Sequence, residues 1–208
     1  IDELHDKGKV VVCYISVGTS EDWREDKDDF PDIAIGNDLE DWDGEAWLDV
    51  NNQVVKDIMA ARVQKAAGMK CDGIEPDNMM VYAEENTGVM VSKEEQIAYN
   101  KWLAETVQAA GMKVALKNAV ELVAELADYF DFAVNEECNQ WDECDIYTST
   151  FLDKTKPVFN VEYENNLDMC DYTNSLGMDT IVKNYDLKGF LCSCVDPSRN
   201  WKCEAKVL

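Results

Sequence analysis

The chain has 208 residues, 46% of them hydrophobic, with six Trp, eight Tyr and six Phe, so it can build one globular domain with a full core and is not disordered. Its 43 acidic and 19 basic residues give a formal net charge of −24, which repels phosphate backbones and anionic membranes and favours cationic ligands. We therefore expect neither nucleic acid nor a membrane as a partner. No apolar run approaches the roughly 18 residues of a membrane span, and no signal peptide is visible, although a mature secreted chain would have lost one.

Six apolar segments recur along the chain with the features of buried strands. They are residues 10–16, 71–78, 111–118, 130–136, 157–163 and 177–184. Two of them read as the same step, G-M-K-V-A-L-K-N and G-M-D-T-I-V-K-N, each after a helical segment that its glycine can terminate. Most are continuous Val, Ile and Phe runs, as expected when both faces of a strand are covered.

Helical patterns fill the intervals between these strands. One begins after Asn52 and keeps its apolar residues on one face until Gly68. A second opens with the capping box of Ser92 and Glu95 and ends before Gly111, and shorter candidates cover residues 120–127 and 167–176. Alternation of strands and helices predicts a parallel sheet or a barrel, and no Pro, Gly or Ser-rich linker divides residues 1–208, so we expect a single domain.

Polar side chains collect where the predicted strands end. A barrel would bring these strand ends to one rim, where they could form a shared site. The residues concerned are Ser16, Asp77, Asn78, Lys117, Asn118, Asn135, Glu136, Glu162, Tyr163, Lys183 and Asn184.

The segment C-D-G-I-E-P-D-N, residues 71–78, places two carboxylates at the end of one strand. Side chains two apart on a strand share a face, so Glu75 and Asp77 should point the same way. A carboxylate at the carboxyl end of a buried strand is the usual position of catalytic groups in parallel α/β folds.

The histidine and cysteine content narrows the chemistry further. His5 is the single histidine and lies near the N-terminus, which disfavours histidine-dependent triads and metal sites and leaves carboxylates as the acids and bases. The eight cysteines do not form the paired C-x-x-C motifs of zinc sites, so we expect disulfides and an extracellular setting. Cys138 and Cys144 are close enough in sequence to close a small loop, and we predict a disulfide between them.

Several motifs, taken in chain order, resemble those of glycoside hydrolase family 114, the endo-α-1,4-polygalactosaminidases. They are C-Y-I-S-V-G-T-S-E-D-W-R, W-L-D-V, C-D-G-I-E-P-D-N, V-A-L-K-N, F-A-V-N-E-E-C and P-V-F-N-V-E-Y, within residues 9–184. The resemblance implies a (β/α)8 TIM-barrel type of α/β fold, secretion, and hydrolysis of a galactosamine-rich polysaccharide without a metal or other cofactor.

The resemblance also implies site residues. Asp77 and Glu136 match the acidic pair of the family, and Lys117, Asn118, Asn135, Glu162 and Tyr163 match positions that line its cleft. We add Ser16, Trp23, Glu75 and Asn78 as candidate substrate-binding residues. Glycoside hydrolysis needs two carboxyl groups beside the scissile bond, and we expect a retaining mechanism while leaving open which residue is the nucleophile.

The substrate would be a polycation when unacetylated. Acidic side chains around the rim would concentrate it electrostatically, unless the net acidity serves solubility alone. The acidic residues expected at the rim are Glu21, Asp22, Glu75, Glu137 and Glu162.

One departure from the family concerns the start of the barrel. The first residues resemble the helix before the third strand, so two strands are expected to be missing and the barrel to be incomplete or open. The edges at residues 10–16 and 180–184 should then be covered by the segment 190–208, which includes Trp201 and Cys203, or by another copy of the chain.

Two alternatives remain open. The first is a non-catalytic carbohydrate-binding protein on a truncated barrel, in which Trp23, Trp42, Trp47 and Trp141 stack on sugars. The second is a calcium-binding extracellular domain, suggested by the acidic residues in 21–32 and 38–45, although neither stretch has EF-hand spacing.

Overall fold

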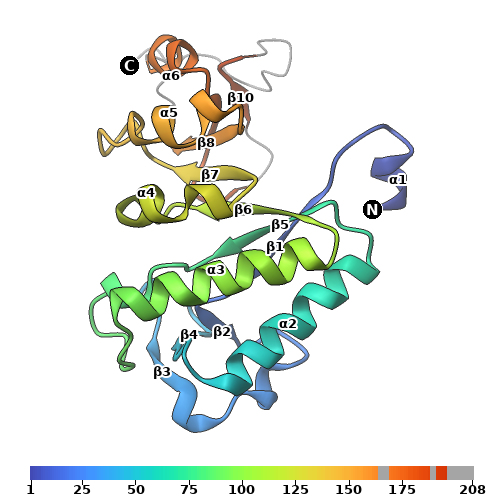
Figure 1. The fold of residues 1–208 in the computed structure, drawn as a ribbon, viewed down its shortest axis with the longest axis vertical. Coiled ribbons are helices and arrows are strands. Elements are labelled where there is room, and N and C mark those ends of the chain that lie inside the picture. The colour runs from blue at the N-terminus through green and yellow to red at the C-terminus, as the bar shows by residue number, and fades with distance from the viewer. Residues whose placement is uncertain (164–168, 188–190, 196–208) are drawn as a thin grey trace. The chain divides into compact units, whose positions relative to one another are not determined.

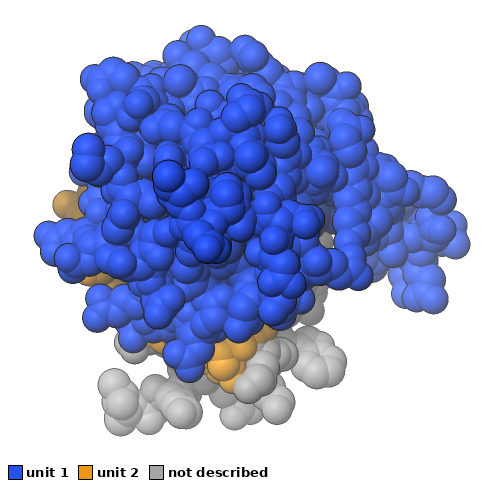
Figure 2. Space-filling view, turned by 90° about the horizontal axis from the view of Figure 1, so that it is seen from below, with its two compact units in different colours: residues 1–130 blue, residues 131–208 orange. Residues whose placement is uncertain are grey.

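The computed structural model describes residues 1–163, 169–187 and 191–195, and the chain forms two compact units, residues 1–130 and 131–208. Figure 2 colours the two units separately. In both units strands alternate with helices, and six of the described strands are parallel to a neighbour (Figure 1). The fold is α/β and of the (β/α)8-barrel type in incomplete form, as the sequence predicts.

Unit 1 is built on three parallel strands. They are β1 (Val12–Ser16), β5 (Gly73–Asp77) and β6 (Lys113–Lys117), in the order β1-β5-β6. Each lies within a segment predicted as a strand and is shorter by one or two residues at one or both ends. Among the described residues no strand pairs with the other side of β1, so this edge is open as predicted.

Helices α2 (Gln53–Gly68) and α3 (Lys93–Ala109) connect these strands and lie side by side (Figure 1). Asn52 caps α2 by accepting from the backbone N–H of Val54, and Ser92 with Glu95 forms the predicted capping box of α3. The predicted apolar faces are buried, which confirms both helices. The buried apolar residues are Val55, Met59, Val63 and Ala66 of α2 and Tyr99, Leu103, Ala104 and Val107 of α3.

A second, antiparallel sheet in unit 1 was not predicted. It has the order β2-β4-β3 and consists of β2 (Thr19–Glu21), β3 (Ile35–Asp38) and β4 (Glu45–Leu48). All three residues of β2 are buried although they are polar, so the strand carries no alternation that a hydrophobic pattern could reveal.

Unit 2 contains three more parallel strands and one antiparallel strand. β7 (Phe132–Glu136), β8 (Val158–Tyr163) and β9 (Asp179–Lys183) are parallel, and β10 (Cys192–Ser193) pairs antiparallel with β9. Part of the segment 190–208 thus covers the edge of β9, as predicted. Trp201 and Cys203 lie outside the described residues.

The remaining helices are short. They are α1 (Asp2–His5), α4 (Val123–Leu126), α5 (Ile146–Thr150) and α6 (Cys170–Leu176), with 3₁₀ turns at Lys27–Asp29, Asp32–Ala34, Val81–Ala83, Val120–Leu122, Ala127–Tyr129 and Leu152–Lys154. The helix predicted over residues 120–127 is therefore a short α-helix flanked on both sides by 3₁₀ turns, and the one predicted over 167–176 begins at Cys170 in the described part. None of the described helices combines the length and hydrophobicity needed to cross a bilayer.

Three disulfides join described cysteines. Cys138 and Cys144 are bonded as predicted, Cys13 on β1 is bonded to Cys71 just before β5, and Cys170 of α6 is bonded to Cys194 after β10. The last two disulfides join residues 58 and 24 positions apart in the sequence, so local cysteine spacing could not predict them.

Candidate active site

The register of unit 1 places the predicted carboxylates on one face of the sheet. Tyr14 is opposite Glu75 and Ser16 is opposite Asp77, so these four side chains share a face. Lys117 joins them at the end of β6, with its Nζ 3.0 Å from Glu75 Oε1 and 3.5 Å from Asp77 Oδ1. The Lys117 side chain is 6% exposed, so its ion pairs are shielded from solvent.

Both oxygens of Asp77 accept hydrogen bonds. The Tyr14 hydroxyl donates to Oδ2 at 3.1 Å, and the backbone N–H of Asn78 donates to Oδ1 at 3.0 Å. Burial and then the charge of Asp77 raise the pKa of Tyr14, so its hydroxyl keeps its proton and remains a donor. These contacts suit an ionised carboxylate, which is an acceptor only.

A buried chain of hydrogen bonds leads away from Asn78. Its side-chain amide donates to Ser16 Oγ at 2.9 Å, Ser16 is hydrogen-bonded to Thr19, and the Thr19 hydroxyl donates to Glu45 Oε2 at 2.7 Å. Glu45 is 5% exposed, and this burial raises the pKa of its carboxyl while the hydrogen bond from Thr19 counteracts the rise. Ser16, predicted to bind substrate, is buried and holds the side chain of Asn78 through this hydrogen bond.

Glu21 was expected among the acidic residues at the rim, and this is wrong. It is 2% exposed, and Arg24 donates to both of its oxygens at 2.6 and 2.8 Å. Arg62 lies 3.7 Å away and also pairs with Asp26. Glu21 is therefore neutralised by arginines within unit 1 and is not positioned to attract a polycation.

The carboxyl end of β7 in unit 2 carries a second group of carboxylates. The Tyr163 hydroxyl donates to Glu136 Oε1, and the Tyr185 hydroxyl donates to Glu137 Oε1 at 2.8 Å. The two tyrosine rings stack with centroids 4.7 Å apart and planes inclined by 20°. The structure thus brings Glu136 and Tyr163 together.

Asn135 and Glu162 are not on the same side as Glu136 and Tyr163. Each directly precedes one of those residues on its strand, and consecutive residues of a strand point to opposite faces. Asn135 is buried and donates to the Tyr147 hydroxyl of α5 at 3.0 Å. Glu162 is buried and accepts from the Asn160 side chain at 2.9 Å and from the backbone N–H of Asn139 at 2.8 Å.

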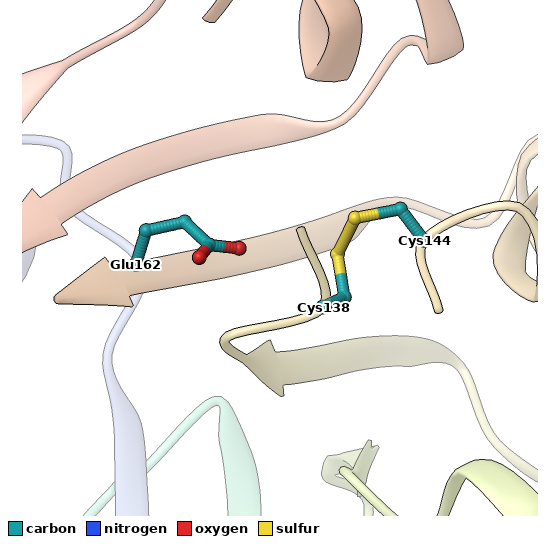
Figure 3. A group of neighbouring side chains, drawn as sticks. All are labelled: Cys138, Cys144 and Glu162. Carbon is teal, nitrogen blue, oxygen red and sulfur yellow. A yellow bond between two sulfur atoms is a disulfide. The ribbon is translucent and has the colours of Figure 1, made fainter. Parts of the chain in front are cut away.

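Glu162 lies close to the disulfide between Cys138 and Cys144. Figure 3 shows its carboxylate pointing toward the bond between Cys138 and Cys144. These three residues are close enough to suggest a metal site, but both sulfurs are consumed by the disulfide, so neither offers a thiolate. The carboxylate instead anchors the loop that follows Glu136, and it does not belong to the rim acids with which it was grouped.

The residues that follow three strands adopt left-handed backbone conformations. Asn78 after β5 has φ 60°, Asn118 after β6 has φ 47°, and Glu137 after β7 has φ 63°. Asparagine tolerates this region, whereas glutamate does so at a cost. The chain therefore turns sharply just beyond Asp77, Lys117 and Glu136.

Tryptophans predicted to meet sugar differ in accessibility. Trp23, Trp42 and Trp141 are exposed, whereas Trp47 is 5% exposed and lies in the core of unit 1. Trp47 therefore cannot stack on a ligand, which removes one of the four tryptophans of the carbohydrate-binding alternative.

Comparison with protein families decides the class. The model of glycoside hydrolase family GH114 matches residues 1–199. The chain belongs to family GH114. It is therefore a glycoside hydrolase by family, as the motifs predict. Comparison with curated protein sequences gives no match.

Solved structures share the fold of this chain. The crystal structure of Aspergillus fumigatus Ega3 in complex with galactosamine is 36% identical, with a TM-score of 0.87 over 93% of this chain and 82% of that chain. The glycoside hydrolase domain of PelA from Pseudomonas aeruginosa shares the fold at 14% identity, with a TM-score of 0.67 over 92% of this chain and 85% of that domain. Amy13B of Eubacterium rectale has a TM-score of 0.51 at 12% identity, over 82% of this chain and 45% of that one, and also indicates the fold alone.

Sequence reasoning missed four residues of this GH114 chain that contact the predicted site. They are Tyr14, Thr19, Glu45 and Tyr185. Tyr14 could have been found, because it precedes Ser16 by two positions on a strand and must share its face. Glu45 comes from the unpredicted sheet, and no local pattern relates it to Ser16.

Proposed function

We propose that this chain is an endo-acting glycoside hydrolase that cleaves α-1,4-linked galactosamine-rich polysaccharide, with Asp77 and Glu136 as its two catalytic carboxyl groups. The observation that carries the proposal is the same arrangement in both units. Each carboxylate ends a parallel strand, and each accepts a hydrogen bond from a tyrosine hydroxyl on the neighbouring strand, Tyr14 or Tyr163.

The contacts of Asp77 favour the ionised role for this residue. It accepts on both oxygens and lies beside Lys117, so a proton on either oxygen would displace a donor. Asp77 is the nucleophile of a retaining reaction. Glu136 then delivers the proton to the leaving oxygen.

The net charge and the match to Ega3 support the proposed substrate. The net charge of −24 attracts a polymer whose amino groups are protonated, and the Ega3 structure contains galactosamine. Substrate recognition at this site draws on Asn78, Lys117, Asn118 and Glu75, which lie at or next to the strand ends, and on the exposed Trp23. The three disulfides support a secreted protein, because such bonds persist in oxidising compartments.

The proposal also includes the organisation of the chain. Residues 1–208 act as one glycoside hydrolase domain, and a second copy of the chain covers the edge of β1 that is open among the described residues. Sedimentation of the purified chain tests the second statement, since a monomer at all concentrations would contradict it.

The experiment that tests the function measures soluble products. The protein is incubated with galactosamine polymers of graded acetylation, and the products are identified by mass spectrometry. We expect oligosaccharides from the deacetylated polymer. Asp77→Asn and Glu136→Gln should each lower the rate by at least about 10²-fold while binding is retained. Release of no product by the wild-type protein, or full rates in either variant, contradicts the proposal.

A second substrate separates the two roles. A galactosamine oligosaccharide with a nitrophenyl leaving group needs little acid assistance, so Glu136→Gln should recover much of its activity on it. Asp77→Asn should not recover, because the nucleophile is still missing. Recovery in Asp77→Asn alone would reverse the assignment, and the anomer released first, followed by NMR, distinguishes retention from inversion.

A further inference from the structure

Two tyrosine–glutamate pairs lie next to each other at the end of β7. Tyr163 donates to Glu136 and Tyr185 donates to Glu137, and the two rings are stacked at a centroid distance of 4.7 Å. The catalytic role proposed for Glu136 uses the first pair. The second pair has no role in that chemistry.

The backbone brings Glu137 to this position at a cost. Consecutive residues of a strand point to opposite faces, so Glu137 would face away from Glu136 if the strand continued. Its left-handed φ of 63° breaks the alternation, and both carboxylates meet the same tyrosine stack. For a residue other than glycine this conformation costs roughly 1–2 kcal/mol, and such strain is concentrated at functional sites.

The surroundings of Glu137 hold the strained residue in place. Its N–H donates to Val161 O at 2.8 Å, and the disulfide between Cys138 and Cys144 follows directly. Asn139, which follows Cys138 in the chain, donates its backbone N–H to the buried Glu162. The loop is thus fastened on both sides of the disulfide, which keeps the carboxylate of Glu137 beside Tyr185.

The Tyr185–Glu137 pair offers two complementary surfaces to a ligand. Tyr185 is 59% exposed although one face of its ring is stacked on Tyr163. Among the described residues the Glu137 carboxylate accepts one side-chain hydrogen bond, which leaves acceptor positions on a group that has about four. An aromatic face binds the apolar face of a sugar ring, and a carboxylate binds an ammonium group.

We propose that Tyr185 and Glu137 form a subsite for one galactosamine unit of the polymer, whose ring stacks on Tyr185 while its ammonium group pairs with Glu137. This inference rests on the proposed function, of which it specifies one contact. It makes the subsite selective, because an N-acetylated unit carries no positive charge and places a bulkier group against Glu137. The pair thereby selects deacetylated stretches of the chain for cleavage at the adjacent Glu136.

The test measures binding, so that it does not depend on cleavage. Titration calorimetry in the Glu136→Gln background compares a galactosamine tetrasaccharide with its fully N-acetylated counterpart. Tyr185→Leu should weaken binding of the galactosamine tetrasaccharide about tenfold, and Tyr185→Phe less, because it keeps the ring. Glu137→Gln should weaken binding of this ligand about tenfold and leave binding of the acetylated one unchanged.

The matched control is Tyr172→Leu. Tyr172 also donates to a carboxylate of unit 2, Asp145 Oδ1 at 3.0 Å, and is partly exposed. This change should not alter the affinity for either ligand, and thermal unfolding of each variant verifies that it is folded.

The outcomes separate the inference from the proposed function. Unchanged affinity and unchanged preference in Tyr185→Leu and Glu137→Gln overturn the subsite, whether or not the wild-type protein cleaves the polymer. Weakened binding in these variants, together with a wild-type protein that releases no product, supports the subsite and refutes the hydrolase.

Discussion

Replacing Thr19 by Val tests the buried chain that supports Asn78. The substitution keeps the shape of the side chain and removes the hydroxyl that donates to Glu45 at 2.7 Å. A hydrogen bond to a charged group contributes about 1.5–3 kcal/mol, and Thr19 is fully buried, so water cannot replace the lost donor. We expect a loss of about 2 kcal/mol in the free energy of unfolding, which lowers the melting temperature by roughly 4–8 °C in a chain of this size.

Denaturant unfolding at about pH 7.5 and pH 4 gives the sharpest measurement. The bond is strongest to ionised Glu45, so the loss should be larger at the higher pH. Thr106→Val is the matched control, because Thr106 donates to the Trp102 carbonyl within α3 at 2.7 Å and carries no charged partner. If Thr19→Val costs no more than Thr106→Val at either pH, Glu45 is hydrated and the buried chain has no energetic significance.

Other changes test other contacts of the site. Because burial raises the pKa of Glu45 above its ordinary 4.5, the stability that this group contributes is complete below that value and is lost as the pH rises through the folded-state pKa. Glu45→Gln should therefore gain stability relative to the wild type between about pH 4 and pH 7.5 in urea unfolding, and a constant difference would refute this sign. Replacing Cys138 and Cys144 by Ser should lower the free energy of unfolding by about 2 kcal/mol, because the disulfide closes a small loop. It should also lower the rate of hydrolysis, because the residues beside Glu136 are no longer restrained. Equal activity at a temperature where both proteins are folded would contradict the second effect. Lys117→Met should lower the free energy of unfolding by about 2 kcal/mol. This is less than the loss of a fully buried ion pair would cost, because Glu75 is 27% exposed. An unchanged urea midpoint would show that solvent already screens the pair.

The strands and long helices could be predicted because their signals are local. Continuous apolar runs fix β1, β5, β6, β7, β8 and β9 to within two residues, and the capping box at Ser92 fixes the start of α3. The shared face of Glu75 and Asp77 follows from strand periodicity alone. The disulfide between Cys138 and Cys144 follows from their short separation, whereas the partner of Cys13 depends on how β1 pairs with β5.

The failures concern the direction in which polar residues point. Asn135 and Glu162 stand at the ends of apolar strands, as Glu136 and Tyr163 do, and the family motifs assigned Glu136 to catalysis and the other three to the cleft. Their actual positions differ because a shift of one residue along a strand reverses the face. Glu21 was misplaced and Glu45 was missed for a different reason. They lie on the short strands β2 and β4, and β2 is polar and buried throughout, so it shows no hydrophobic alternation.

The left-handed residues after the strands explain why the turns at Asn78 and Asn118 could be predicted from the sequence and the turn at Glu137 could not. Asn78 and Asn118 are residue types that accept this conformation, so K-N and D-N after a strand already suggest a sharp turn. Glutamate is not such a residue type, and the motif N-E-E-C does not indicate that the backbone of Glu137 turns its side chain to the face opposite to the expected one. Its strain is tolerable because the disulfide of Cys138, the Val161 carbonyl and Glu162 restrain the loop. A local pattern therefore predicts the bond that stabilises this turn, while the turn itself, and with it the meeting of two glutamates and two tyrosines, arises only when β7, β8 and the segment after β9 come together.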